Sequence, residues 1–211
     1  MYEDERKILL DICIRMIELG MVIGSSGNAS IRIEDHVVIT PSSVEYLTMT
    51  PDEMVVVNLQ GEIIEGERNP SVEKYMHLGV YNAREEAKAI VHSHSIHASA
   101  LAVLRRSLPP VIDEVVPKLG GEIRVAEYAM PGTKDLASNV VKALEMRSGV
   151  LLANHGALCF GKNIAEALHN SVLLERSCRI YLIALQAGTP VELPEDVVED
   201  EADIWDMMRS Y

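Results

Sequence analysis

The chain has 211 residues, of which 48% are hydrophobic and 24% charged, and its formal net charge is −13 at pH 7. This composition is typical of a soluble globular protein, and the length suits a single domain, which we place at residues 1–211. The negative charge disfavours binding to the phosphate backbone of nucleic acids. Because the sequence has neither an apolar run of about 18 residues nor a basic leader, we expect a cytoplasmic protein without a membrane segment.

The first third of the chain alternates between helical and strand patterns. Apolar residues at helical spacing predict a packing helix over residues 4–19. Strands are predicted at 29–33 and 37–40, and residues 54–65 are typical of a hairpin. The next helix is predicted from residue 71 to residue 84, with Ser71 as its N-cap.

Three clusters of small polar residues lie in this region, and each forms either a plain turn or part of an anion-binding cradle. The clusters comprise Ser25, Gly27 and Asn28, then Ser42 and Ser43, and finally Ser71. Backbone N–H groups and hydroxyls beside a helix N-terminus bind anions without a lysine. An acidic protein can therefore hold a phosphate monoester there.

The strongest chemical signal is a pair of histidines two residues apart, His92 and His94, in a strand predicted over 88–94. Side chains at this spacing leave the same face of a sheet, so they form either an alternating strand end or part of a metal site. His155 lies in an apolar run, 150–156, that predicts another strand ending at a glycine, and Glu73 supplies a carboxylate. Three imidazoles and one oxygen ligand are the donor set of a catalytic zinc site.

Other titratable residues have less specific surroundings. His77, four residues after Glu73, is either a further ligand or a buried, hydrogen-bonded histidine. The three cysteines are scattered in apolar segments and predict buried core thiols without disulfides. Asp113 and Glu114 follow a double proline and are either loop charges or a catalytic acid/base.

The second half of the chain predicts a helix at 96–104, a short strand at 123–127, a helix that begins at Thr133, and a long amphipathic helix over 163–185. From residue 191 the chain is acidic and proline-spaced, and we assign no element to it. It ends at Tyr211. Neither an internal repeat nor an interdomain linker interrupts the pattern.

Five segments resemble, in the same order, motifs of the class II aldolase/adducin family. They are GSSGNASIR at 24–32, ITPSSV at 39–44, PSVEKYMH at 70–77, AIVHSHSIHASAL at 89–101 and LLANHGALCFGKN at 151–163. Within the family they are most similar to the branch of L-fuculose-1-phosphate aldolases. The resemblance implies an α/β domain in three layers, with a central, mainly antiparallel β-sheet flanked by helices. It also implies a homotetramer with active sites at subunit interfaces.

The resemblance assigns roles to the candidate residues. His92, His94 and His155 would be the zinc ligands, and Glu73 would ligate the resting metal and act as acid/base. The three polar clusters would bind the substrate phosphate. The implied reaction is cleavage of a ketose 1-phosphate, such as L-fuculose 1-phosphate, to dihydroxyacetone phosphate and an aldehyde through a zinc-stabilised ene-diolate.

Alternatives within the family remain open. They are a pentulose-phosphate 4-epimerase like that for L-ribulose 5-phosphate, a methylthioribulose-1-phosphate dehydratase and a non-enzymatic, adducin-like interaction protein. The epimerase branch typically carries aspartate where this chain has Glu73, and the adducin-like alternative does not need the metal ligands present here. The donor set also accepts Mn²⁺, Co²⁺ or Fe²⁺.

Two departures from the aldolase pattern concern substrate binding and proton transfer. Val72 stands where the fuculose-phosphate enzymes have a second phosphate-binding serine, and Asp113 and Glu114 occupy the stretch that holds their tyrosine acid/base. We predict that Asp113 or Glu114 replaces that tyrosine. Tyr211 corresponds either to the family's C-terminal tyrosine, which reaches a neighbouring active site, or to a free chain end.

Overall fold

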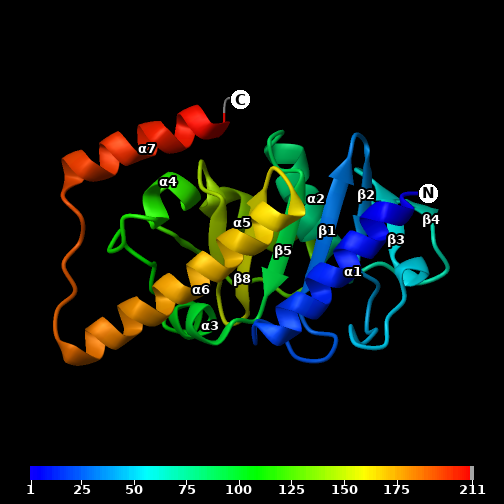
Figure 1. Cartoon of the computed structure of the whole chain (residues 1–211), viewed down its shortest axis with the longest axis horizontal. Coiled ribbons are helices and arrows are strands. Elements are labelled where there is room, and N and C mark those ends of the chain that lie inside the picture. The colour runs from blue at the N-terminus through cyan, green and yellow to red at the C-terminus, as the bar shows by residue number, and fades with distance from the viewer. Residues whose placement is uncertain (210–211) are drawn as a thin grey trace.

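The computed structural model describes residues 1–209, which form an eight-stranded sheet with helices on both faces (Figure 1). The strands are β1 (Asn28–Ile33), β2 (His36–Ile39), β3 (Val55–Asn58), β4 (Ile63–Glu65), β5 (Ala89–Ser93), β6 (Val125–Ala126), β7 (Gly149–Leu152) and β8 (Gly156–Gly161). Their spatial order is β4-β3-β2-β1-β5-β8-β7-β6. All neighbouring strands are antiparallel except β6 and β7, which confirms the predicted mainly antiparallel sheet.

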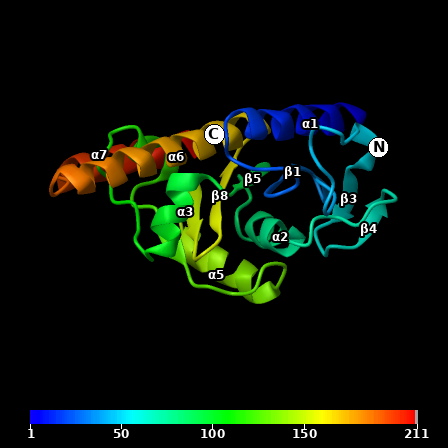
Figure 2. The same cartoon turned by 90° about the horizontal axis from the view of Figure 1, so that it is seen from below.

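The sheet is apolar on both faces, so it requires a helical layer on each side. The helices are α1 (Glu3–Glu18), α2 (Lys74–Ala83), α3 (Ile96–Val103), α4 (Val115–Leu119), α5 (Lys134–Leu144), α6 (Ile164–Ala187) and α7 (Glu195–Arg209). Alternation along β3 illustrates the pattern: Val55 and Val57 pack towards α2 and α5, whereas Val56 packs towards α1. Figure 2 shows the sheet between α1 and α6 on one side and α2 and α5 on the other. The predicted three layers are confirmed.

Local signals explain where several elements begin. The Thr133 hydroxyl accepts a hydrogen bond from the Leu136 amide, so α5 begins where the sequence predicted. Asn163 caps α6 in the same way through the Glu166 amide. The three cysteines are buried and free, as predicted.

The predicted start of α2 was wrong by three residues. The helix begins at Lys74 with Glu73 as its N-cap residue, and Ser71 lies before it. The Ser71 amide donates to the Thr40 carbonyl at 2.9 Å, and Pro70 pairs with Pro41 in an isolated bridge, so this segment stays extended. The Ser71 hydroxyl instead accepts from the Glu73 amide at 3.2 Å.

The predicted strand around His155 was also wrong at its end. Strand β7 stops at Leu152 and β8 begins at Gly156, so His155 lies in the tight turn between them. The His155 amide donates to the Leu152 carbonyl at 3.0 Å, and Asn154 adopts a left-handed φ of 54°. A Cβ on Gly156 would clash with the Ser93 carbonyl oxygen. Glycine therefore lets this turn approach the end of β5.

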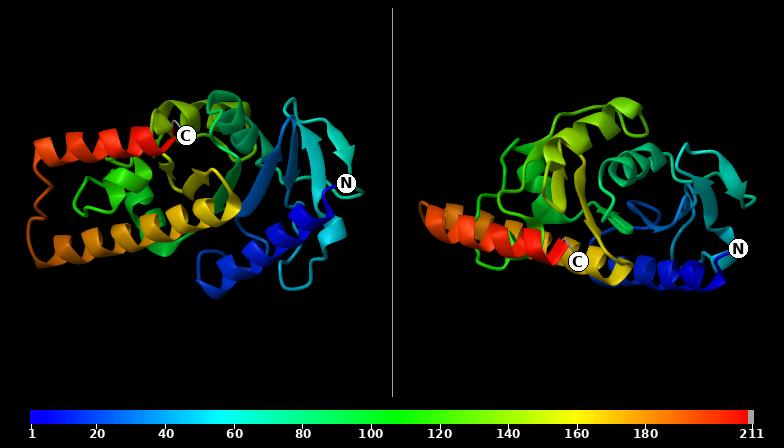
Figure 3. Two further views of the ribbon diagram at one scale, coloured as in Figure 1. Left: turned by 45° about the horizontal axis from the view of Figure 1, so that its top comes forward. Right: turned by 90° about the horizontal axis from the view of Figure 1, so that it is seen from above.

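The acidic C-terminal segment, to which we assigned no element, forms a helix, α7. Figure 3 shows α7 joined to the end of α6 by an extended segment. Trp205 anchors α7: its ring is buried against Gly120, and its indole N–H donates to the Ser148 hydroxyl at 3.3 Å. None of the described helices has the length and apolar content needed to cross a membrane. Tyr211 lies outside the described residues.

Candidate active site

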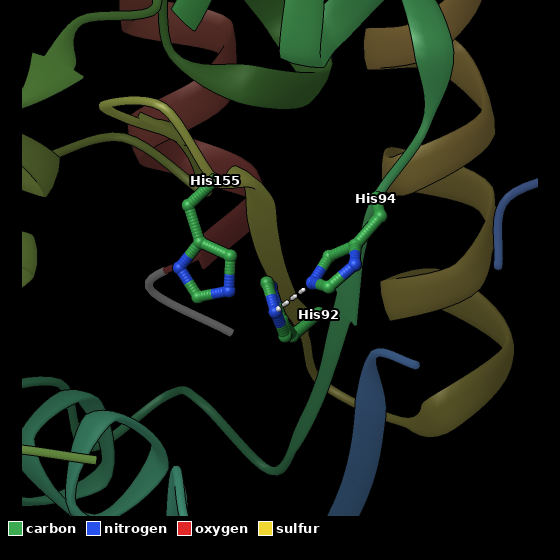
Figure 4. Close-up of side chains that lie close together, drawn as sticks. All are labelled: His92, His94 and His155. Atoms are coloured by element: carbon green, nitrogen blue, oxygen red, sulfur yellow. Dashed lines mark hydrogen bonds between the residues drawn. The ribbon is translucent and has the colours of Figure 1, made fainter. Parts of the chain in front are cut away.

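Three histidines meet at one end of the sheet (Figure 4). His92 lies on β5, His94 directly follows that strand, and His155 lies on the β7–β8 turn. The Nε2 atoms of His92 and His94 are 3.1 Å apart, and the His155 ring centroid is 4.7 Å from that of His92. One ligand nitrogen from each histidine lies within 4.8 Å of the other two. The structure thus brings together the three predicted ligands.

The protonation of these histidines suits metal binding. His92 Nδ1 donates to the Ala157 carbonyl at 2.9 Å, which leaves the Nε2 lone pair facing the cluster. Burial, together with the neighbouring His92, lowers the pKa of His94 and of His155 to about 4. Both rings are therefore neutral at physiological pH. Burial opposes the charged form of His92, but the adjacent Glu73 outweighs it and raises the pKa of His92.

Glu73 faces the three imidazoles from the N-terminal end of α2. Its Oε2 lies 3.2 Å from His92 Nε2, and its Oε1 lies 3.3 Å from His155 Nε2. Burial alone would raise the pKa of Glu73, but His92, His155 and a hydrogen bond from Asn28 together hold that pKa well below its usual range. The carboxylate is therefore charged. Among the described residues, its buried Oε1 has no hydrogen-bond partner.

These groups fit a divalent metal ion. Zinc–nitrogen bonds of about 2.0–2.1 Å in tetrahedral geometry place two ligand nitrogens about 3.3 Å apart, close to the separation of His92 and His94. The two Nε2 atoms at 3.1 Å can share one hydrogen bond, but when both rings carry their protons on Nδ1, both Nε2 lone pairs are available to one cation. The unpartnered Glu73 Oε1 supplies an oxygen ligand at the same point.

The three polar clusters lie in adjoining segments beside this site. Tyr46, three residues after Ser43, holds this segment against the first cluster, because its hydroxyl donates to the Gly27 carbonyl at 2.7 Å and its amide to the Gly24 carbonyl at 3.4 Å. The Ser42 amide donates to the Asn69 carbonyl at 2.9 Å and joins the second cluster to the third. The fold therefore gathers hydroxyls and backbone amides from segments up to 45 residues apart near Glu73.

The members of these clusters differ in accessibility. Ser25 is exposed, and Ser42 and Ser43 bring their hydroxyls within 3.4 Å of each other. Ser71 is buried. Gly27 permits a close approach, since a Cβ there would lie 2.6 Å from the His92 carbonyl oxygen.

Asn28 differs from the other predicted phosphate ligands because its side chain is already engaged. The residue is 4% exposed, and its Nδ2 donates to Glu73 Oε2 at 2.8 Å. Its Oδ1 lies 2.5 Å from His77 Nε2. His77 is also hydrogen-bonded to Ser30. Of the two alternatives predicted for His77, a further metal ligand or a buried, hydrogen-bonded histidine, the structure supports the second.

Asp113 and Glu114 lie away from the histidine cluster within one chain. Both are exposed in the segment before α4, and Glu114 forms a 3.0 Å ion pair with Arg176 of α6. Across residues 1–209, neither a hydrogen bond nor an ion pair joins either carboxylate to the three histidines. Their catalytic role stays a prediction, as does that of Tyr211.

Comparison with known proteins gives a consistent assignment. A family model described as "Class II Aldolase and Adducin N-terminal domain" matches residues 7–182. The chain is similar to a 5-deoxy-D-ribulose 1-phosphate aldolase of Bacillus thuringiensis serovar kurstaki, with 39% identity over 95% of this chain and 94% of the relative. It is 32% identical to the L-fuculose phosphate aldolase of Escherichia coli K12, and the match covers 96% of this chain and 93% of that relative.

A solved structure supports the same grouping. An L-fuculose 1-phosphate aldolase superimposes with a TM-score of 0.92 and 37% identity, and the match covers 96% of each chain. The family match spans most of the chain, and it includes all three histidines and Glu73. The chain therefore belongs to the class II aldolase and adducin family, as one of its aldehyde-lyases.

Proposed function

We propose that this enzyme is a zinc-dependent aldolase that cleaves the C3–C4 bond of a ketose 1-phosphate to dihydroxyacetone phosphate and an aldehyde. The observation that carries the proposal is the convergence of three imidazoles with Glu73 Oε1, which accepts no hydrogen bond among the described residues, beside hydroxyl-rich loops. The names of the relatives suggest 5-deoxy-D-ribulose 1-phosphate and L-fuculose 1-phosphate as substrates. These compounds share the phosphate end and differ in the aldehyde released.

The histidines and Glu73 have separate tasks in this proposal. His92, His94 and His155 would hold the zinc ion, which supplies positive charge where the electrons of the broken bond collect. Glu73 is ionised before substrate binds, so it would first take the proton of the C3 hydroxyl and then return it to C3 of the resulting ene-diolate; the proton that the second acid/base takes from the C4 hydroxyl would complete dihydroxyacetone phosphate. Its buried position beside the ligands, with one oxygen free of hydrogen bonds, supports this role.

The phosphate end of the substrate would bind the three polar clusters, except for the Asn28 side chain, which is already hydrogen-bonded to Glu73 and His77. Backbone amides and the hydroxyls of Ser25, Ser42, Ser43 and Ser71, beside the positive end of α2, suit a dianion. Gly27 lets the loop of the first cluster approach β5 at His92. Val72, which is 64% exposed next to Glu73, supplies no hydroxyl. Fixing the phosphate orients the bond to be broken relative to Glu73.

The proton on the C4 hydroxyl requires a second acid/base, for which we propose Asp113 or Glu114. Since neither carboxylate contacts the histidines of its own chain, this role requires a neighbouring subunit in the homotetramer that we also propose. Tyr211 would act across the same interface. The cytoplasm, where sugar phosphates are held, is the proposed location.

The Asp113→Asn and Glu114→Gln variants test this assignment. We expect the variant that lacks the true acid/base to lose about 10²-fold or more in turnover, while the other stays close to wild type. The variant that loses activity is then mixed with Glu73→Gln subunits. Activity should return in the mixed assemblies, because some sites across an interface then combine an intact Glu73 from one subunit with the intact acid/base from its neighbour. Full activity in both amide variants would eliminate both carboxylates.

The proposed reaction is tested by following dihydroxyacetone phosphate with a coupled enzyme. The zinc-loaded protein is offered 5-deoxy-D-ribulose 1-phosphate, L-fuculose 1-phosphate and L-fuculose without phosphate. We expect release from at least one phosphorylated ketose and none from the free sugar. An epimerised ketose or a dehydrated product without dihydroxyacetone phosphate would instead support the epimerase or dehydratase alternative.

A further inference from the structure

A continuous chain of buried hydrogen bonds leads from the core to Glu73. The Tyr81 hydroxyl lies 2.7 Å from Ser30 Oγ, and Ser30 Oγ lies 2.7 Å from His77 Nδ1. His77 Nε2 lies 2.5 Å from Asn28 Oδ1, and Asn28 Nδ2 lies 2.8 Å from Glu73 Oε2. Every member of this chain is buried. Five side chains therefore form one polar path through an otherwise apolar layer.

Two regular elements align these side chains. Asn28 and Ser30 are two residues apart on β1 and leave the same face of the sheet. His77 and Tyr81 are four residues apart on α2 and lie on one face of that helix. Figure 2 shows α2 lying against the sheet on the side opposite α1. The path thus alternates between the strand and the helix packed on it.

The orientation of the Asn28 amide fixes the direction of the hydrogen bonds as far as Ser30. The NH₂ group of Asn28 donates to Glu73, so its oxygen faces His77, and an amide oxygen can only accept. His77 must then carry its proton on Nε2 and accept at Nδ1 from the Ser30 hydroxyl. The Tyr81 hydroxyl lies 2.7 Å from Ser30 Oγ and 3.1 Å from the Ser30 carbonyl oxygen, to which it can also donate. Burial lowers the pKa of His77 to about 3, which is consistent with the neutral ring.

We infer that Tyr81, Ser30, His77 and Asn28 form a positioning relay that holds Glu73 Oε2 in place and leaves Oε1 free for chemistry. The inference rests on the acid/base role proposed for Glu73. In this relay the Asn28 side chain serves the Glu73 carboxylate, because its Nδ2 is hydrogen-bonded to Glu73 and its Oδ1 to His77. His77 touches neither metal nor substrate and acts through Asn28.

Two replacements of His77 separate positioning from packing. His77→Phe keeps a ring of similar size but removes both nitrogens, so the amide of Asn28 loses its orientation. We expect kcat to fall by about 10- to 100-fold with little change in KM and with zinc retained. His77→Gln restores a donor towards Asn28 and should recover most of the rate. Equal kcat in wild type and a folded His77→Phe variant would overturn the relay.

Asn28→Ala tests which end of the substrate this residue serves. The relay predicts a lower kcat, with unchanged competitive inhibition by inorganic phosphate. A phosphate ligand predicts the opposite, namely weaker inhibition by phosphate and a raised KM. Loss of phosphate affinity with kcat intact would overturn the assignment of Asn28 to the relay.

Nitrogen-15 NMR of the histidines in the zinc-loaded wild-type protein tests the donor direction without any assay of catalysis. The relay requires a neutral His77 with hydrogen on Nε2. A proton on Nδ1, or a doubly protonated ring, would overturn it even in an active enzyme. Failure of the wild type to cleave any ketose 1-phosphate would contradict the proposed function instead, and the NMR result would still decide the hydrogen-bond direction.

Discussion

Glu73→Gln is expected to lower the turnover number for aldol cleavage by about 10²- to 10⁴-fold, the usual contribution of a positioned acid/base. Glutamine has nearly the same shape as glutamate and keeps an oxygen that can accept from Asn28, but it cannot carry a proton to and from C3. The three histidines remain, so zinc should still bind. Steady-state kinetics, together with zinc analysis of the purified variant, measure both effects.

The control for this variant is Glu85→Gln, which removes an exposed carboxylate just after α2. It should have wild-type kinetics. A Glu73→Gln enzyme that binds zinc and turns over at the wild-type rate would show that another group carries the proton. If the variant lost activity and excess zinc restored it, Glu73 would be assigned to metal binding alone.

His155→Ala is expected to weaken zinc binding by more than about 10²-fold. Removing a residue that only hydrogen-bonds to a metal ligand typically costs about 10- to 100-fold, so the loss of a ligand itself should cost more. His155 is one of three nitrogen donors, and the turn that carries it is held against β5 by the close approach of Gly156. Activity should fall with metal content. Competition against a chromogenic chelator measures the affinity.

His169→Ala is the matched control, because His169 is an exposed histidine on α6 outside the cluster. Its zinc affinity should equal that of the wild type. If His155→Ala bound zinc as tightly as the His169→Ala control, the three-histidine site would be refuted.

Residue spacing alone was sufficient to predict most of the individual helices and strands, whereas their three-layer arrangement was implied by the resemblance to the family. The period of the first helix gave its bounds to within one residue, since α1 buries an apolar stripe that includes Leu9, Cys13 and Met16. The two-residue spacing of His92 and His94 placed both rings at one end of a strand. These features depend on local periodicity, which a sequence displays directly.

The errors arose where tertiary contacts override local pattern. The apolar run around His155 concealed a turn, because β7 and β8 are buried on both faces and neither strand alternates with polar residues. The pairing of Pro41 with Pro70 keeps the chain extended there, so α2 begins later in the sequence than predicted. The acidic segment after residue 191 became helical because Trp205 packs on Gly120, which is 85 residues earlier in the chain.

The relay to Glu73 was beyond sequence analysis for the same reason. Its bonds join residues 45 to 51 positions apart, and serine, asparagine and tyrosine in those positions are unremarkable on their own. Only the packing of α2 against β1 brings them into line. The predicted alternatives for His77 included a buried, hydrogen-bonded residue, but its partners could not be named.

In the proposed function, metal held by His92, His94 and His155 is essential for aldol cleavage. The most direct test measures release of dihydroxyacetone phosphate from a ketose 1-phosphate by wild-type protein stripped with a chelator and then titrated with Zn²⁺. We predict that release is abolished by stripping and returns in proportion to zinc, reaching its plateau at about one ion per chain. Full activity in the stripped protein, or none after zinc rebinds, would rule out zinc-dependent cleavage at these three histidines.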